Sequence, residues 1–261
     1  MKRKLPLTFR TCRFSCALAA KLPLIAAALI ALCFSGCVVV NFAEPGSTAP
    51  AGRRETYEFK VGEFNRVKIE GFFDTRFYSA PSDTVKLEVQ PNIMEYYSIE
   101  VIDGELIVRT TRSISFGFNN SPILTISSPK LDRITFEGVG SFTAYDKITA
   151  DSLTFIFTGA GNGKAELDTD FLSAEISGTG KLELSGRANT ANLELSGTGE
   201  LSALRLQTND ANIDLSGTGT IRVSCSENLR INADGVGTVE YRGSPRVNIN
   251  KDGLVTIRQV N

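Results

Sequence analysis

The stretch LELSGTGELS, at residues 193–202, contains four residues, Ser-Gly-Thr-Gly, that occur three times in the chain. The other two copies begin at Ser177 and Ser216. More generally, two glycines separated by one residue recur about every 20 residues. The pairs are Gly138/Gly140, Gly159/Gly161, Gly178/Gly180, Gly197/Gly199, Gly217/Gly219 and Gly235/Gly237. Internal repeats of this length indicate a solenoid, so the repeat has to be interpreted before any single motif.

Apolar and polar residues alternate on both sides of each glycine pair. Around Gly197 the apolar positions are Leu193 and Leu195 before the pair, and Leu201 and Ala203 after it. The unit at Gly159–Gly163 fits only with a two-residue slip, which turns Ala165 and Leu167 inward. No helical periodicity competes with this alternation. The pattern predicts an all-β fold, a β-solenoid (β-helix) with rungs of about 20 residues, in which each strand pairs with the same strand one rung away.

The glycine pairs are expected at the corners of these rungs, where positive φ or close contact between rungs excludes a Cβ atom. Phosphate binding is the competing interpretation, and Gly159–Lys164 (GAGNGK) is the segment most similar to a nucleotide-binding loop. A P-loop requires Ser or Thr after the lysine, whereas Ala165 follows Lys164. A dinucleotide-binding loop leads into a helix, whereas more strand is expected here.

The composition excludes several classes of function. The chain has no histidine, which removes Ser-His-Asp and Cys-His catalysis and the commonest metal ligand. No catalytic and no cofactor-binding residue is predicted, and the chain is not expected to be an enzyme. Cleavage after residue 36 would remove six basic residues and no acidic one, leaving a net charge near −7. An acidic chain of this kind is not expected to bind nucleic acid.

The N-terminus has the layout of a secretory signal. Basic residues precede an apolar run at residues 22–34, and Ser35 and Gly36 stand before Cys37. Phe34-Ser35-Gly36-Cys37 resembles the cleavage site of bacterial lipoproteins, in which the cysteine becomes the lipidated first residue. The domains are then a lipoprotein signal peptide (1–36), a flexible tether after lipidated Cys37 (37–54) and a β-solenoid (55–261). A transmembrane anchor and an ordinary signal with an incidental cysteine are the alternatives.

Two further groups of residues have candidate roles. Cys225 is the only cysteine left in the mature body, and it is expected to be a small core or corner residue. Glu175, Glu194 and Asp214 each stand three positions before a glycine pair, so stacking predicts a column of three carboxylates. Either this column is solvated or its oxygens hold a hard cation such as Ca²⁺. Glu183 and Glu240 form no second column, because Ser202 and Arg222 separate them.

Several segments together resemble one bacterial family. They are VKIEGFFDTRFYSA (67–80), VIDGELIVRTT (101–111), the glycine repeats and VEYRGSPRVNINKDGLVTI (239–257). Their order and spacing, over roughly residues 58–258, resemble the head GIN domain family, described as auto-transporter adhesins. The resemblance implies a right-handed β-helix on lipid-anchored or exported envelope proteins, and it brings no catalytic residues.

The sequence therefore predicts a cell-envelope lipoprotein, anchored in the outer membrane through its N-terminal lipid and facing the periplasm or the cell surface. Its expected function is adhesion, through a glycan or protein ligand bound on an extended surface. One alternative is a structural envelope protein with no specific ligand. Another is a carbohydrate-active β-helix enzyme.

Overall fold

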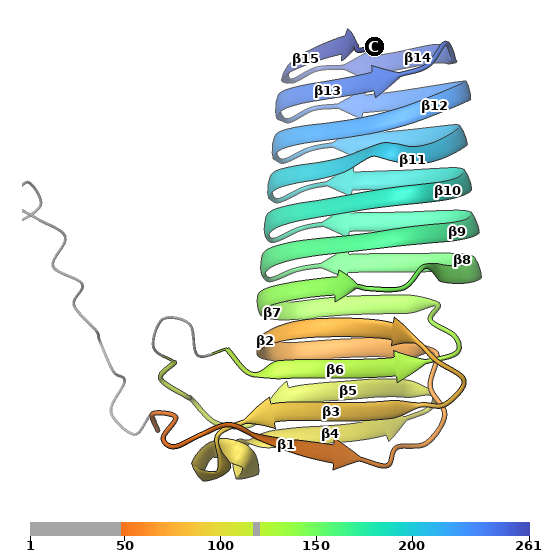
Figure 1. Cartoon of the computed structure of the whole chain (residues 1–261). Coiled ribbons are helices and arrows are strands. Elements are labelled where there is room, and N and C mark those ends of the chain that lie inside the picture. Colours follow the sequence, from red (N-terminus) through yellow and green to blue (C-terminus); the bar gives the residue numbers. More distant parts are fainter. Residues whose placement is uncertain (1–47, 117–120) are drawn as a thin grey trace, which may run out of the picture. The chain divides into compact units, whose positions relative to one another are not determined.

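A computed structural model describes residues 48–116 and 121–261 of the chain. The signal peptide expected at residues 1–36, Cys37 and the first part of the tether lie outside the described residues. The structure is almost entirely β-strand and forms a β-solenoid of about 7 turns, which confirms the predicted fold class (Figure 1).

The described residues form fifteen strands and one short 3₁₀ helix. They are β1 (Glu55–Phe59), β2 (Arg66–Ser79), β3 (Thr84–Val89), the 3₁₀ helix η1 (Pro91–Tyr96), β4 (Tyr97–Ile102), β5 (Glu105–Thr110), β6 (Ile123–Ser128), β7 (Arg133–Ala144), β8 (Ile148–Phe157), β9 (Ala160–Ile176), β10 (Thr179–Leu195), β11 (Thr198–Leu215), β12 (Thr218–Ala233), β13 (Val236–Arg242), β14 (Arg246–Lys251) and β15 (Leu254–Gln259).

From β7 onward the strands stack in parallel, as the repeat predicts. Gly180 pairs with Gly161 on one side and with Gly199 on the other, and Gly219 and Gly237 continue the column. Each rung thus contributes one segment after its glycine corner and one segment before the next corner. The segments that follow a corner form one side of the solenoid, here sheet A, and the segments that precede a corner form the other, here sheet B (Figure 1).

The glycine column extends beyond the six pairs visible in the repeat. Gly71 in β2 pairs with Gly138, and a Cβ atom on Gly253 would lie 2.2 Å from the carbonyl oxygen of Gly235. Both glycines lack the second glycine of a pair, because Phe73 and Val255 occupy those positions. The sequence pattern therefore missed these two corners.

The slip expected at Gly159–Gly163 is wrong. Gly161 pairs directly with Gly180, and Gly163 pairs with the inward-facing Leu182, so the register runs on without interruption. A Cβ atom on Gly163 would lie 2.6 Å from Leu182 Cδ1 and 2.8 Å from Phe157 Cζ. These two side chains fill the space that an apolar side chain at position 163 would need.

Leucine, isoleucine and valine columns fill the core between the sheets in the C-terminal rungs, and aromatic rings fill it nearer the N-terminus. Phe73, Phe77, Phe136, Phe142 and Phe155 are fully buried. The rings of Phe136 and Phe157 stack with their centroids 5.2 Å apart.

The N-terminal end departs from the parallel stack. β3 pairs antiparallel with β1 and with β6, and β4 pairs antiparallel with β5. The turn between β4 and β5 is Asp103-Gly104, where both residues have positive φ, as in a tight hairpin. η1 buries Ile93 at the same end. The final part of the expected tether, residues 48–54, lies near η1, since the Ala51 amide donates to Asn92 Oδ1 (2.9 Å).

Candidate ligand-binding surface

The outer face of sheet B carries polar side chains in two adjacent columns. The strand register places Glu194 between Glu175 and Asp214, which confirms the predicted stacking of the three carboxylates. Asn232 and Asn250 continue this column on the next rungs. The neighbouring column, two residues earlier in each rung, consists of Ser173, Asn192, Asn212, Arg230 and Asn248.

The carboxylate column is electrostatically unfavourable at its centre. Partial burial raises the pKa of Glu194 first, and the charges of Glu175 and Asp214 raise it further. Within the described parts of the chain, no group of three or more acidic or cysteine side chains lies close enough together to hold a metal ion. The calcium alternative thus stays a prediction, for which a solution test is given below.

The neighbouring column, here called the amide column, contains a hydrogen bond between two of its rungs. Asn212 Nδ2 donates to Asn192 Oδ1 across 2.8 Å, so the two amides lie in the same orientation one rung apart. Each amide retains a further donor and acceptor capacity on its solvent side. A shallow groove of about 370 Å³ runs along the two columns, and its polar lining includes Asn192, Glu194, Asn212, Asp214 and Arg230.

A second shallow depression, of about 400 Å³, continues this groove toward the corner opposite the glycines. Its lining shares Asn212 and Arg230 with the first groove and adds Asp210, Asn228 and Arg246. Asn228 Nδ2 donates to Asp210 Oδ1 across 2.6 Å, which fixes both side chains at the corner. The two depressions form one polar strip, the sheet B groove, which crosses successive rungs.

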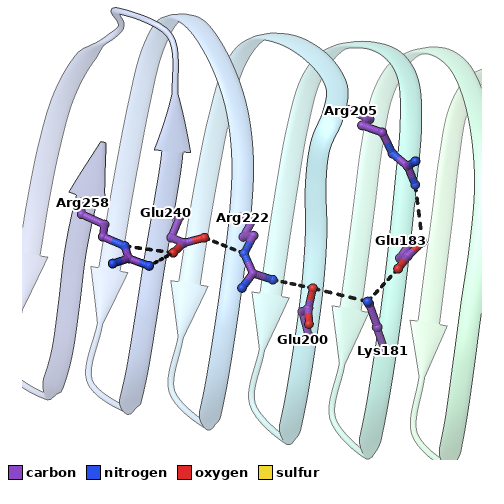
Figure 2. A network of polar contacts seen from close by, with 7 residues as sticks. All are labelled: Lys181, Glu183, Glu200, Arg205, Arg222, Glu240 and Arg258. Carbon is purple, nitrogen blue, oxygen red and sulfur yellow. Dashed lines mark hydrogen bonds and ion pairs between the residues drawn. The ribbon is translucent and has the colours of Figure 1, made fainter. Parts of the chain in front are cut away.

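Sheet A presents a different arrangement, a continuous chain of alternating charges (Figure 2). Lys181 Nζ contacts Glu183 Oε1 (2.7 Å) and Glu200 Oε1 (3.7 Å). Arg222 bridges Glu200 and Glu240, and Arg258 binds the other side of Glu240. Arg205 joins the far end of the chain through Glu183 Oε2 (3.4 Å). These seven residues are the sheet A charge ladder.

Glu240 is the most enclosed member of the ladder, with 9% of its side chain exposed. Hydrogen bonds from Arg258 and Arg222 lower the pKa of its carboxyl group, despite the opposing effect of burial. The sequence was correct that Glu183 and Glu240 form no acidic column. It missed that Arg222, the residue that separates them, links Glu240 to Glu200. Because every charge in the ladder has an opposite charge beside it, this face has little free hydrogen-bonding capacity.

The remaining sequence candidates have structural roles. Cys225 is buried and free, and burial raises the pKa of its thiol, which opposes reactivity. Five of the six residues of Gly159–Lys164 already belong to β9, which runs from Ala160 to Ile176, so no helix N-terminus follows the segment. No helix among the described residues is long and apolar enough to span a membrane. Cys37 lies outside the described residues.

Solved structures of the same fold come from Bacteroides and Parabacteroides species. A "putative adhesin" from Bacteroides fragilis is 27% identical to the chain, with a TM-score of 0.77, and the match covers 82% of this chain and 100% of that one. A "putative lipid binding protein" from Parabacteroides distasonis is 20% identical, with a TM-score of 0.69 and the same coverage. At that identity the second likeness shows the fold alone. A comparison with curated proteins gives no match.

The family comparison covers more than half of the chain. Residues 63–245 match the model of the family described as "Putative auto-transporter adhesin, head GIN domain". This range includes all six glycine pairs and most of the sheet B groove. The family and the structure from Bacteroides fragilis are named for adhesion, which indicates a cell-surface or envelope protein. The chain belongs to the head GIN domain family of adhesin-like proteins.

Proposed function

We propose that this protein is a non-catalytic adhesin of the cell envelope that binds a glycan in the sheet B groove. The observation that carries the proposal is the amide column, in which Asn192 and Asn212 are aligned by their 2.8 Å hydrogen bond beside Arg230. Aligned amides, carboxylates and a guanidinium group donate and accept hydrogen bonds in the way that sugar hydroxyl groups require.

The shape of the groove favours an extended ligand. The groove is shallow and open, and it crosses several rungs. A compact small molecule is bound in a site that encloses most of its surface. A linear polymer can instead make a few weak contacts on each rung, and the regular spacing of the rungs repeats those contacts. A polysaccharide therefore fits this surface better than a small ligand does.

A glycan array probed with the full chain tests the proposal. We expect binding that is lost in Asn212→Leu and weakened about tenfold or more in Arg230→Ala. The matched control is Arg205→Ala, which removes the same side chain from the opposite sheet. Binding that is weakened equally by Arg205→Ala would show that the groove is not the site. Absence of binding to every glycan, with a protein ligand also absent from envelope pull-downs, would favour the structural alternative.

One observation supports the enzymatic alternative. The register places the carboxyl group of Glu194 between those of Glu175 and Asp214, and partial burial and these two neighbours raise the pKa of Glu194. Glycoside hydrolysis uses a pair of carboxyl groups, one of which has a raised pKa. Release of reducing ends from a polysaccharide by the wild type, abolished in Glu194→Gln, would establish this function in place of adhesion.

The proposed cellular setting is that of a lipoprotein. In this proposal Cys37 carries the lipid and residues 37–54 connect it to the solenoid, which holds the groove away from the outer membrane. The lipoprotein-like residues Phe34-Ser35-Gly36-Cys37 support this setting, as does membership of an adhesin-like family.

A further inference from the structure

Both ends of the solenoid leave strand edges open. In sheet A the strand order runs from β1 at one end to β15 at the other, and in sheet B the corresponding outermost strands are β4 and β14. No described strand pairs with the outer edge of any of these four. Figure 1 shows β1 at the N-terminal end of the stack and β14 and β15 at the opposite end. Unpaired edges present rows of backbone donors and acceptors that can pair with another chain.

The C-terminal end also exposes apolar side chains that the repeat places toward the core. Val247 and Ile249 pair with the buried residues Leu229 and Ile231, yet they are 37% and 50% exposed because no further rung covers them. Terminal repeats of solenoids normally carry a polar cap, so this apolar end indicates a contact surface.

The two ends match in strand length. β1 has 5 residues and β15 has 6, while β4 and β14 have 6 each. β1 runs parallel to the sheet A segments, because it is antiparallel to β3, which is antiparallel to β6, which is parallel to β2. A second copy placed end to end would therefore continue sheet A in parallel pairing and sheet B in antiparallel pairing.

The two ends also match in charge. β14 and β15 contain Arg246, Lys251 and Arg258 and no acidic residue. At the other end β1, η1 and β4 contain Glu55, Glu58, Glu95 and Glu100 and no basic residue. Arg258, Glu58 and Glu100 each also contact an opposite charge within their own copy, namely Glu240, Lys86 and Arg109, and Arg53 and Arg54 precede β1. The contrast is therefore one of the edge elements themselves. Two C-terminal ends facing each other would bring like charges together, whereas a C-terminal end facing an N-terminal end pairs opposite charges.

We propose that copies of this chain stack head to tail, with β15 of one copy pairing with β1 of the next and β14 pairing with β4. The columns of paired residues that run through the solenoid give the register of this contact. In sheet A the column of Ile257 ends at Tyr57, so Ile257 faces Tyr57 and Arg258 faces Glu58 of the next copy. In sheet B the column of Ile249 ends at Val101, so Ile249 faces Val101 and Asn250 faces Glu100. Such a contact is heterologous and leaves one free end of each kind, so the assembly grows into a fibre of stacked solenoids.

Cysteine cross-linking of the full chain tests this geometry. The register places Thr56 and Thr256, both exposed, on facing strands of neighbouring copies, within the range that a disulfide spans. Under mild oxidation, a mixture of Thr56→Cys and Thr256→Cys chains should give a cross-linked dimer. The chain with both substitutions should give a ladder of multiples. Each singly substituted chain alone should show no more cross-linking than the unsubstituted chain, which controls for the native cysteines.

A pair of charge substitutions provides an independent readout that needs no new cysteine. Asn250→Glu should weaken self-association, measured by sedimentation velocity, about tenfold, because it faces Glu100 of the next copy, and adding Glu100→Arg should restore it. Cross-linking of Thr256→Cys alone into dimers would overturn the proposal in favour of C-terminal ends that face each other. A chain that sediments as a monomer at all concentrations, with no cross-linking in the mixture, would overturn it altogether.

Discussion

At the corner formed by Gly197 and Gly199, the two glycines are required for different reasons. Gly197 does not have a positive φ, but a Cβ atom there would lie 2.0 Å from the carbonyl oxygen of Gly178 on the neighbouring rung. Gly199 has a φ of +147° and a similar overlap with Gly180. The residue between them, Thr198, is exposed. Close approach of the rungs thus fixes the first glycine, and backbone conformation adds to it at the second.

Substitutions at Gly197 and Thr198 should differ in their effect on stability, because position 197 contacts the next rung and position 198 faces solvent. We expect Gly197→Val to lower the free energy of unfolding by about 3 kcal/mol, because the backbone of the next rung has to move. Thr198→Val changes an exposed side chain of similar shape and should stay within about 0.5 kcal/mol of the wild type. Chemical denaturation of the two variants measures the difference. Equal stabilities would mean that the rungs are not in contact at Gly197.

The carboxylate column gives a second prediction at the scale of a residue. Because its folded pKa is raised, ionised Glu194 costs stability as the pH rises through its titration range. Glu194→Gln should therefore raise the melting temperature near pH 7, by the equivalent of a few tenths to about 1 kcal/mol. The gain should shrink in high salt and disappear at a pH low enough to protonate Glu194.

Calcium would reverse the sign of that effect. If the column holds Ca²⁺, the wild type gains stability when Ca²⁺ is added, and Glu194→Gln loses this gain. A calcium-dependent rise in the wild-type melting temperature that is absent from the variant would establish a cation site at Glu175, Glu194 and Asp214. A destabilising effect that is the same with and without salt or calcium would contradict the interpretation of the column as a repulsive stack.

At the scale of the elements, the sheet A charge ladder joins successive strands of sheet A through their side chains, in addition to their backbone pairing. Isolated ion pairs on a surface contribute little, because water screens them and long side chains lose freedom. Glu240 differs, since its side chain is 9% exposed and accepts hydrogen bonds from Arg222 and Arg258. The ladder therefore concentrates its stabilising effect on the last rungs, β12 to β15, where the apolar core has no further rung to cover it.

Glu240→Gln tests the contribution of the ladder. We expect a loss of about 2 kcal/mol near pH 7, because two arginines lose a charged acceptor. The folded pKa of Glu240 is lowered from 4.5, so its contribution is complete above that value and is lost as the pH falls through the folded pKa. The difference between variant and wild type should vanish in that acidic range. Glu183→Gln, where 32% of the side chain is exposed, is the control and should cost less than about 1 kcal/mol.

At the scale of the whole molecule, the prediction concerns attachment to the membrane. If Cys37 carries the lipid, Cys37→Ser should move the protein into the soluble fraction or leave residues 1–36 uncleaved. The reason is that stable attachment depends on the acyl chains at this residue. Membrane fractionation together with mass spectrometry of the N-terminus measures both results. A variant that is cleaved normally and still partitions with the membrane would show that something other than Cys37 holds it there.

The sequence by itself determined the fold class and most of the corners. The glycine pairs and the alternation around them specify a rung of about 20 residues, since only stacked rungs bury both flanking strands. The repeat also predicted that Glu175, Glu194 and Asp214 lie in one column. Residues at the same distance from the glycine pair occupy the same position on successive rungs.

Only the tertiary structure decided how neighbouring rungs fit together and how the solenoid ends. Gly163 looked like a slip because the ring of Phe157, from the preceding strand, fills its space, and no local pattern records that contact. The bridge from Arg222 to Glu200 and Glu240 joins residues 18 and 22 positions apart, so it depends on where long side chains reach across rungs. The open edges of β1, β4, β14 and β15 follow from which strands lack a neighbour. A strand's own residues specify its two faces, whereas its edges depend on the rest of the fold.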